Sequence, residues 1–114
     1  MRWRWFRRWA SPGWNFNHIP GGEERPTSAG ARLKRAGFAP GWSDFILLPP
    51  RDALLVRAHF LELKRRGSVL SAAQLAVAEW CVKSGTPFEI AYDFAHAIEI
   101  LKRWGAVRAG IRVQ

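Results

Sequence analysis

The sequence predicts an α/β fold, with a mixed sheet of about four strands flanked by about three helices. Two patterns and the chain length indicate this class. Short apolar runs bounded by glycine or proline have the character of strands, and they lie at residues 14–19, 42–48, 54–65 and 87–92. Segments with helix caps and helical apolar spacing lie at residues 28–36, 72–84 and 94–104. The 114 residues, 48% of them hydrophobic, are enough for the core of one small domain.

The first half of the chain is expected to hold two strands, one helix and the approach to the third strand. Pro20-Gly21-Gly22 ends the first strand, because proline and glycine interrupt regular structure. Thr27 or Ser28 is expected to cap a helix that ends at Gly37. A Pro40-Gly41 turn then precedes the second strand.

The second half contains the clearest helix caps. Ser71 is a good N-cap, and Gln74 stands at the spacing of a capping box. Gly85 is expected to end this helix. After the fourth strand, Asp93 is expected to cap a last helix that ends before Gly105. These local signals place helices against a mixed sheet.

The charge of the chain suggests its partner. The formal net charge of +9 indicates a polyanion; nucleic acid is the usual one, and an anionic membrane surface is the alternative. Cys81 is the single cysteine, so neither an intrachain disulfide nor a cysteine-based zinc site is expected. No apolar run approaches the ~20 residues of a membrane-spanning helix, and no stretch of signal-peptide length follows the basic N-terminus. These features predict a cytoplasmic protein.

Residues 1–13 differ from the rest and are expected to form a basic, aromatic arm before a domain at residues 14–108, with a tail at residues 109–114. Residues 1–9 interleave arginine with tryptophan and phenylalanine. The segment is expected to be a mobile arm or a partly paired edge strand. An arm of this composition contacts nucleic acid through phosphates and stacked bases, although a membrane-surface peptide has the same composition.

Two acids and a lysine lie within or at the end of apolar strands. Asp44 begins the apolar run of the second strand, and Glu62-Leu63-Lys64 lies in the third. Residues two apart in a strand share a face, so Glu62 and Lys64 are expected to point the same way and Leu63 into the core. Buried acids are costly unless they are paired or hold a metal. Their convergence suggests a site that binds a hard cation and cleaves phosphodiester bonds.

Each residue also has a simpler explanation when it is taken alone. Asp44 can begin a turn, Glu62 and Lys64 can line a solvated strand face, and Gln74 can be only a cap. The other conspicuous side chains have no assigned chemistry. His59, His96 and Cys81 are expected to be structural, and Trp42, Trp80 and Trp104 to lie in the core or at an interface.

Four stretches in this order resemble a known family: Gly41-Trp42-Ser43-Asp44, Glu62-Leu63-Lys64, Leu70-Ser71-Ala72-Ala73-Gln74 and Gly85. The segment at residues 17–108 resembles the VRR-NUC (virus-type replication-repair nuclease) domain of the PD-(D/E)xK nuclease superfamily. The resemblance implies a restriction-endonuclease-like core. Ser43 departs from the proline of the superfamily name, and Gly21 from a common asparagine, whereas Arg25 matches.

The resemblance also implies roles for the site residues. Asp44 and Glu62 are expected to bind Mg²⁺, or Mn²⁺ as a substitute, through oxygen, together with the carbonyl of Leu63 and an upstream acid, Glu23 or, as second choice, Glu24. Lys64 is expected to orient the attacking water or to stabilise charge on the phosphate. Gln74 is expected to hydrogen-bond Lys64 or the water. The catalytic set is Asp44, Glu62, Lys64 and Gln74, and the expected DNA contacts are Arg25, Lys34, Arg35, Arg65 and Arg66.

The function that follows is a metal-dependent, structure-specific DNA endonuclease, acting on branched DNA such as four-way (Holliday) junctions. The resemblance implies a homodimer in a bacterial or phage-infected cell, with no membrane partner and no small-molecule cofactor. A two-fold dimer presents two equivalent sites to the two cuts of a junction. The alternatives are a non-catalytic basic DNA-binding module, a nicking or flap nuclease, an RNA-directed nuclease and a membrane-active protein that acts through the N-terminal arm.

Overall fold

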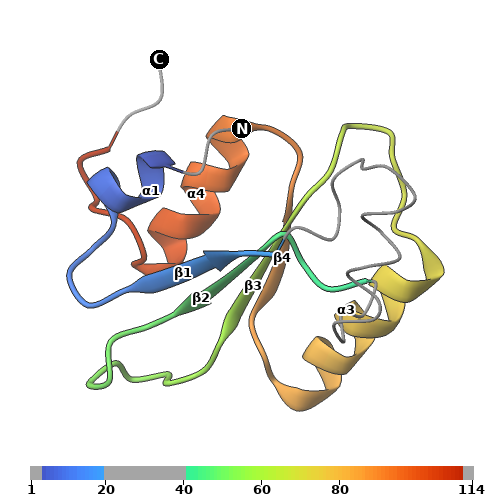
Figure 1. The fold of residues 1–114 in the computed structure, drawn as a ribbon, viewed down its shortest axis with the longest axis horizontal. Coiled ribbons are helices and arrows are strands. Elements are labelled where there is room, and N and C mark those ends of the chain that lie inside the picture. The colour runs from blue at the N-terminus through green and yellow to red at the C-terminus, as the bar shows by residue number, and fades with distance from the viewer. Residues whose placement is uncertain (1–3, 20–40, 112–114) are drawn as a thin grey trace, which may run out of the picture.

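The protein is described by a computed structural model that covers residues 4–19 and 41–111 (Figure 1). The elements are helix α1 (Arg4–Trp9), strands β1 (Asn15–His18), β2 (Phe45–Leu48) and β3 (His59–Leu63), helix α3 (Ala72–Ser84), strand β4 (Phe88–Ala91) and helix α4 (Phe94–Trp104). Within these residues the predicted α/β class is confirmed, because three helices accompany one four-stranded mixed sheet. The helix predicted between Ser28 and Ala36 lies outside the described residues.

The strands follow the order β1-β2-β3-β4. The pairs β1–β2 and β2–β3 are antiparallel, and β3–β4 is parallel. Phe45 stands opposite Leu61 in the β2–β3 pair, and continuing this register by one residue sets Asp44 opposite Glu62. Residues directly opposite in an antiparallel pair point to the same face of the sheet. The topology therefore brings the two predicted acids together.

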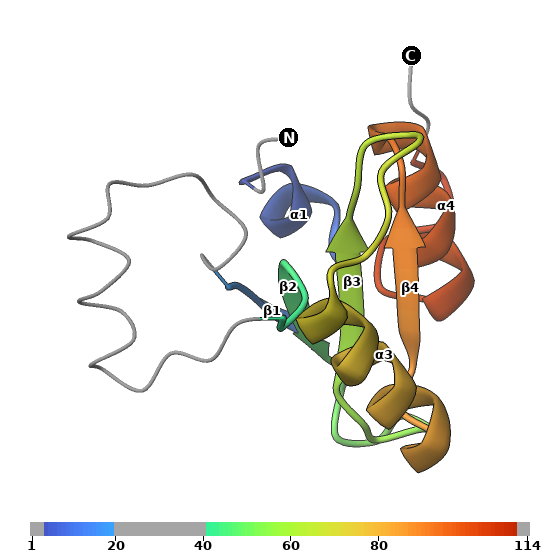
Figure 2. The same ribbon diagram turned by 90° about the vertical axis from the view of Figure 1, so that its right-hand side faces the viewer.

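The main core lies on one face of the sheet, where α1 and α4 lie side by side, whereas α3 lies apart from them on the other side (Figures 1 and 2). The buried cluster consists of Phe6, Phe45, Leu47, Leu61, Ala91, Ala97, Ile100, Leu101, Ala106 and Val107. Leu63 packs against this cluster, as predicted. Its neighbours Glu62 and Lys64 consequently point to the face on which α3 lies.

Helix α3 is fixed at both ends by the predicted caps. Ser71 and Gln74 form the capping box, and Gly85 ends the helix in the left-handed conformation with φ +71°. Cys81 is its only buried residue, and Trp80 is 60% exposed. Trp42, which precedes β2, is also exposed, so neither tryptophan lies in the core, and an interface is the predicted position that stays open for both.

The N-terminal segment differs from the prediction. Residues 4–9 form α1, and its Phe6 is only 3% exposed. The Arg108 N–H donates to the Trp9 carbonyl at 3.0 Å, and Ala10 forms an isolated bridge with Val107. The mobile arm or edge strand predicted for residues 1–13 is therefore wrong for residues 4–13, which pack with the domain.

The third strand lies within residues 54–65, the segment that was predicted to contain it. Leu54, Leu55 and Val56 lie in an exposed loop, and β3 begins only at His59. His59 is buried between the rings of Trp14 and Trp104, and its Nδ1 donates to the Arg57 carbonyl at 2.8 Å. This contact set supports the structural role predicted for His59.

Among the described residues, no helix is both long enough and apolar enough to cross a membrane.

Candidate active site

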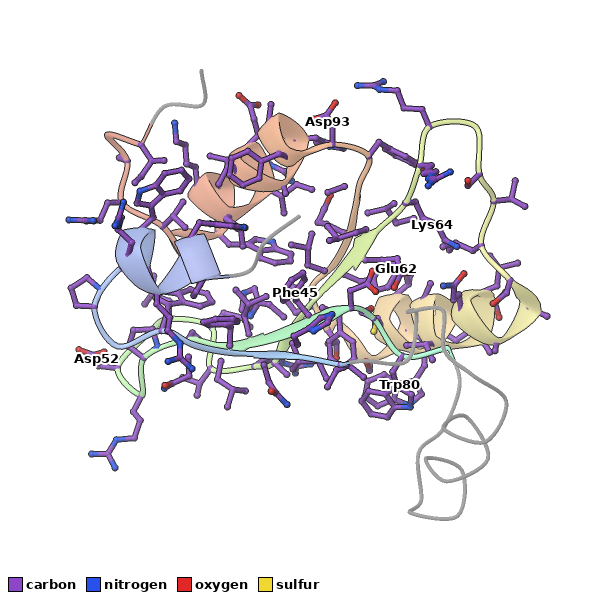
Figure 3. All side chains as sticks on the ribbon, turned by 45° about the horizontal axis from the view of Figure 1, so that its top comes forward. Phe45, Asp52, Glu62, Lys64, Trp80 and Asp93 are labelled. Atoms are coloured by element: carbon purple, nitrogen blue, oxygen red, sulfur yellow. The ribbon has the colours of Figure 1, made fainter. Side chains whose placement is uncertain are left out.

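The two predicted acids meet at the end of the β2–β3 pair. Asp44 lies one residue before β2, and its Oδ2 accepts a 2.7 Å hydrogen bond from the Leu63 N–H. Glu62 points away from the main core, to the side of β3 that faces α3, and is only 4% exposed (Figure 3). The ladder register, rather than sequence proximity, therefore positions these two carboxyl groups as neighbours.

Gln74 connects the start of α3 to this acid pair. Its Nε2 donates to Glu62 Oε1 at 2.9 Å, while its Oε1 accepts from the Ser71 N–H at 2.9 Å. Lys64, one of the two predicted partners of Gln74, could only donate to the amide oxygen, and the capping box already uses that oxygen. Gln74 therefore bonds Glu62 instead. Gln74 thus contributes both to the N-terminal cap of α3 and to the candidate site.

Gly41 allows the chain to approach α3 closely just before Asp44. Its φ is +90°, and a Cβ at this position would lie 2.5 Å from the Ala73 carbonyl oxygen. Any side chain here would force the strand and the helix apart, because real Cβ atoms do not approach backbone so closely. Gly41 therefore helps to set the distance between the segment that carries Asp44 and the helix that carries Gln74.

The acid pair is strongly coupled. Burial, and after it the negative charge of Asp44, raises the pKa of Glu62 from 4.5 to about 7, although the Lys64 ammonium opposes this. Burial also raises the pKa of Asp44. The hydrogen bond from the Leu63 N–H and the nearby His18 and Lys64 act in the opposite direction and lower this pKa, but burial has the larger effect. Two neighbouring buried carboxyl groups resist simultaneous ionisation. Near neutral pH the metal-free pair therefore retains a proton, which Glu62 holds for part of the time.

Lys64 and His18 are the basic residues that act on Asp44. Lys64 shares its strand face with Glu62, and its charge acts on both acids. Its backbone N–H donates to the Ala91 carbonyl at 2.9 Å, so β4 holds this part of the chain. His18 ends β1 and stands opposite Phe45, one residue from Asp44. The scattered positions of the histidines along the chain carry no signal for this placement, which only strand pairing reveals.

The donor set of the site fits a magnesium ion. The Leu63 N–H and the Gln74 amide each bond one carboxyl oxygen, and the two carboxyl groups also hydrogen-bond each other, so a cation would take the place of the proton that they share. The carbonyl of Leu63 faces the same side as its N–H, towards Asp44, because both groups of a strand residue point to one side. Mg²⁺ is usually bound by one or two carboxylates, with waters and substrate phosphates completing its shell. Mn²⁺ takes the same oxygen ligands.

A third acidic ligand was expected at Glu23 or Glu24, and both lie outside the described residues. Over residues 4–19 and 41–111, no three His, Cys, Asp or Glu side chains gather into a metal-binding group. The described part of the site therefore offers two carboxylates and a carbonyl, a number that matches the few protein ligands of Mg²⁺.

The expected DNA contacts divide into two groups. Arg25, Lys34 and Arg35 lie outside the described residues. Arg65 and Arg66 follow β3 and are exposed. Arg66 Nη2 donates to Asp93 Oδ2 at 2.8 Å in a surface ion pair, so it must exchange this partner to contact a phosphate. Arg65 is consequently the better placed of the two to contact DNA.

The raised pKa of Glu62 predicts how stability depends on pH. Between pH 4.5 and about 7 the folded protein holds a proton that the unfolded chain releases, so the free energy of unfolding falls as the pH rises. We expect a loss of roughly 3 kcal/mol across this window for the metal-free wild type, relative to Glu62→Gln. Urea unfolding of both proteins at pH 4.5 and pH 8 measures it. Parallel pH profiles would show that Glu62 titrates normally.

No protein-family model matches this chain, and neither a curated protein nor a solved structure is significantly similar to it.

Proposed function

We propose that this protein is a metal-dependent endonuclease that hydrolyses phosphodiester bonds in DNA. The observation that carries the proposal is the pairing of Asp44 with the buried Glu62, with Gln74 bonded to Glu62 and the charge of Lys64 beside both acids. A purely structural pair of such acids is costly, because both carboxyl groups lose hydration and the two cannot ionise together. A bound divalent cation compensates both costs, so the arrangement is better explained as a cation site.

The chain contributes binding and orientation to such a reaction. When Mg²⁺ is bound, it supplies Lewis-acid polarisation of the phosphate and an acidified water. Asp44 and Glu62 would hold it, and Leu63 fixes Asp44 through its N–H. Gln74 restricts the rotation of Glu62, which would orient this carboxylate for a bound cation. Lys64 provides a donor and a positive charge for the phosphate oxygens on which negative charge builds up.

Lys64 is expected to act on the chemical step. We expect Lys64→Met to lower the single-turnover cleavage rate about 10²–10³-fold, the usual loss for one donor to a developing anion. Manganese binding should persist, because removing a cation does not weaken the attraction of the acid pair for a metal. Rapid-quench kinetics and titration calorimetry with Mn²⁺ separate the two effects. The matched control is Lys83→Met, since Lys83 is exposed in the last turn of α3. Normal cleavage combined with weak metal binding would contradict this role.

The substrate class rests on the charge and on the resemblance to the VRR-NUC family. A net charge of +9 favours a polyanion. We propose branched DNA as the substrate and a homodimer as the active form, because two-fold related sites match the two cuts of a four-way junction. Exposed apolar side chains of α3, including Leu75, Trp80 and Val82, offer surface that a second copy can cover.

The decisive experiment compares nucleic-acid substrates and metals. Labelled duplex, flap, single-stranded and four-way-junction DNA, with an RNA counterpart, are incubated with Mg²⁺, Mn²⁺ or EDTA. Cleavage of DNA that requires the metal supports the proposal, and the preferred substrate selects among junction, flap and nicking activity. A supercoiled cruciform plasmid distinguishes paired cuts, which give linear product, from independent nicks. Binding without cleavage under every metal condition would leave a non-catalytic DNA-binding module.

A further inference from the structure

Trp42 is an exposed tryptophan beside the acid pair. It is 46% exposed, although it stands only two residues before Asp44. Its ring centroid lies 5.7 Å from that of Phe60, and the two ring planes are inclined by 34°. Phe60 and Glu62 are two residues apart in β3, so they share one face of the strand. The ring of Trp42 therefore packs against the face of the sheet that carries Glu62.

The backbone on either side of Trp42 is held in place. Gly41 lies so close to Ala73 of α3 that it has no room for a side chain. Ser43 is only 1% exposed, and Asp44 is hydrogen-bonded to the backbone of β3. Trp42 is thus an exposed side chain in a segment that is fixed on both sides. A large ring that is already positioned loses little conformational freedom when it binds a ligand.

The position of the ring suits an unpaired nucleobase. Two residues of extended chain span at most about 7 Å, which is about two base steps, because successive nucleotides of one duplex strand rise about 3.4 Å. A phosphate held at Asp44 would thus place the bases of adjacent nucleotides within reach of Trp42. A base inside a duplex is stacked on its neighbours, whereas an unpaired base can turn out of the strand and stack on an aromatic side chain. Such stacking tolerates any sequence, because every base has a π-face.

We propose that Trp42 stacks on an unpaired base next to the phosphodiester bond that the acid pair cleaves. This inference rests on the proposed nuclease function and specifies the DNA feature that the site recognises. Phe60 supports one part of the Trp42 ring, and the base covers part of the exposed surface. Fully paired DNA offers no free base to this ring. Trp42 therefore favours substrates with unpaired nucleotides at the cut, such as branch points and single-stranded tails.

The test measures binding, in EDTA, to a labelled duplex that ends in a short thymidine tail and to the same duplex with an abasic tail of equal length. Both DNAs carry the same phosphates, so their difference in affinity reports contacts with the bases. Trp42→Leu keeps an apolar cover on Phe60 but has no ring. It should bind the thymidine tail about 5- to 150-fold more weakly than the wild type, the range for stacking of one base. It should bind the abasic tail like the wild type.

Two further variants and two measurements serve as controls. Trp42→Phe keeps a ring over Phe60 and should retain most of the difference in affinity between the two tails. Trp80→Leu removes another exposed tryptophan, which lies on α3, and should keep the whole difference (Figure 3). The slope of log K against log salt should be the same for Trp42→Leu and the wild type, because stacking neutralises no phosphate. Sedimentation of each variant without DNA shows whether a second copy of the chain covers Trp42.

The outcomes separate the role of Trp42 from the nuclease function, because cleavage is measured on its own in Mg²⁺. A wild type that cleaves DNA but binds both tails equally overturns the stacking and leaves the function intact. Equal weakening for both tails in Trp42→Leu, or its conversion from dimer to monomer, also overturns the stacking. A preference for the thymidine tail that is lost only in Trp42→Leu, in a protein that cleaves nothing, supports the stacking and overturns the function. Absence of DNA binding overturns both.

Discussion

Glu62→Gln and Asp44→Asn should each abolish metal-dependent DNA cleavage, with a loss of about 10³-fold or more. Metal ions contribute several kcal/mol of charge stabilisation to such reactions, and about 1.4 kcal/mol corresponds to a factor of ten in rate. Each amide keeps the shape of the acid but removes its charge. In Glu62→Gln the amide oxygen can still accept the hydrogen bond from Gln74 Nε2, and in Asp44→Asn the amide oxygen can still accept the Leu63 N–H. The fold should therefore survive while the cation site is destroyed.

Cleavage in these variants is compared with that of Glu79→Gln. Glu79 is exposed in α3, so this control removes one negative charge from the same side of the sheet without touching the acid pair. It should cleave at the wild-type rate. In metal-free buffer, Glu62→Gln should also be the more stable protein above pH 7, because it removes a buried carboxylate. Wild-type cleavage by either site variant in Mg²⁺ would show that the assignment of the two acids is wrong.

The parts of the fold that the sequence predicted are those set by local interactions. Ser71 and Gln74 form their capping box and Asp93 caps α4 through the His96 N–H, because each cap needs only residues a few positions apart. Gly85 and Gly105 end their helices with positive φ for the same reason. The pairing of Asp44 with Glu62 was also predictable, since a pair of antiparallel strands that carries both acids has few registers that bury its apolar residues.

The parts that the sequence did not predict depend on contacts between distant segments. The capping-box spacing indicates that Ser71 uses the amide oxygen of Gln74, but nothing near Gln74 indicates that Glu62 uses its nitrogen. The six-residue helix α1 is far shorter than the ~12–15 residues at which isolated helices become marginally stable. Its alternating arginines therefore suggested an exposed arm. The one available signal was the spacing of Trp5 and Trp9, which are four residues apart and share a helix face.

Phe6→Ala should destabilise the protein by about 3–5 kcal/mol, the usual cost of truncating a buried phenylalanine. Phe6 is 3% exposed, and its ring centroid lies 4.5 Å from that of Phe16 on β1. A small void of about 10 Å³ already lies beside Phe6, lined only by apolar residues that include Leu61 and Leu101. Truncation would enlarge this void, and its apolar walls would keep it dry, so no water would replace the packing of the ring. Urea unfolding followed by tryptophan fluorescence measures the destabilisation.

The size of this effect decides whether α1 belongs to the core. Phe6→Leu keeps most of the apolar volume and should cost less than about 1.5 kcal/mol. Arg8→Ala changes an exposed position of the same helix and should stay within about 0.5 kcal/mol of the wild type. If Phe6→Ala is as stable as Arg8→Ala, α1 does not contribute to the fold and the predicted arm is restored. If only Phe6→Ala is strongly destabilised, α1 contributes to the core of the domain, and the exposed arm predicted for these residues is ruled out.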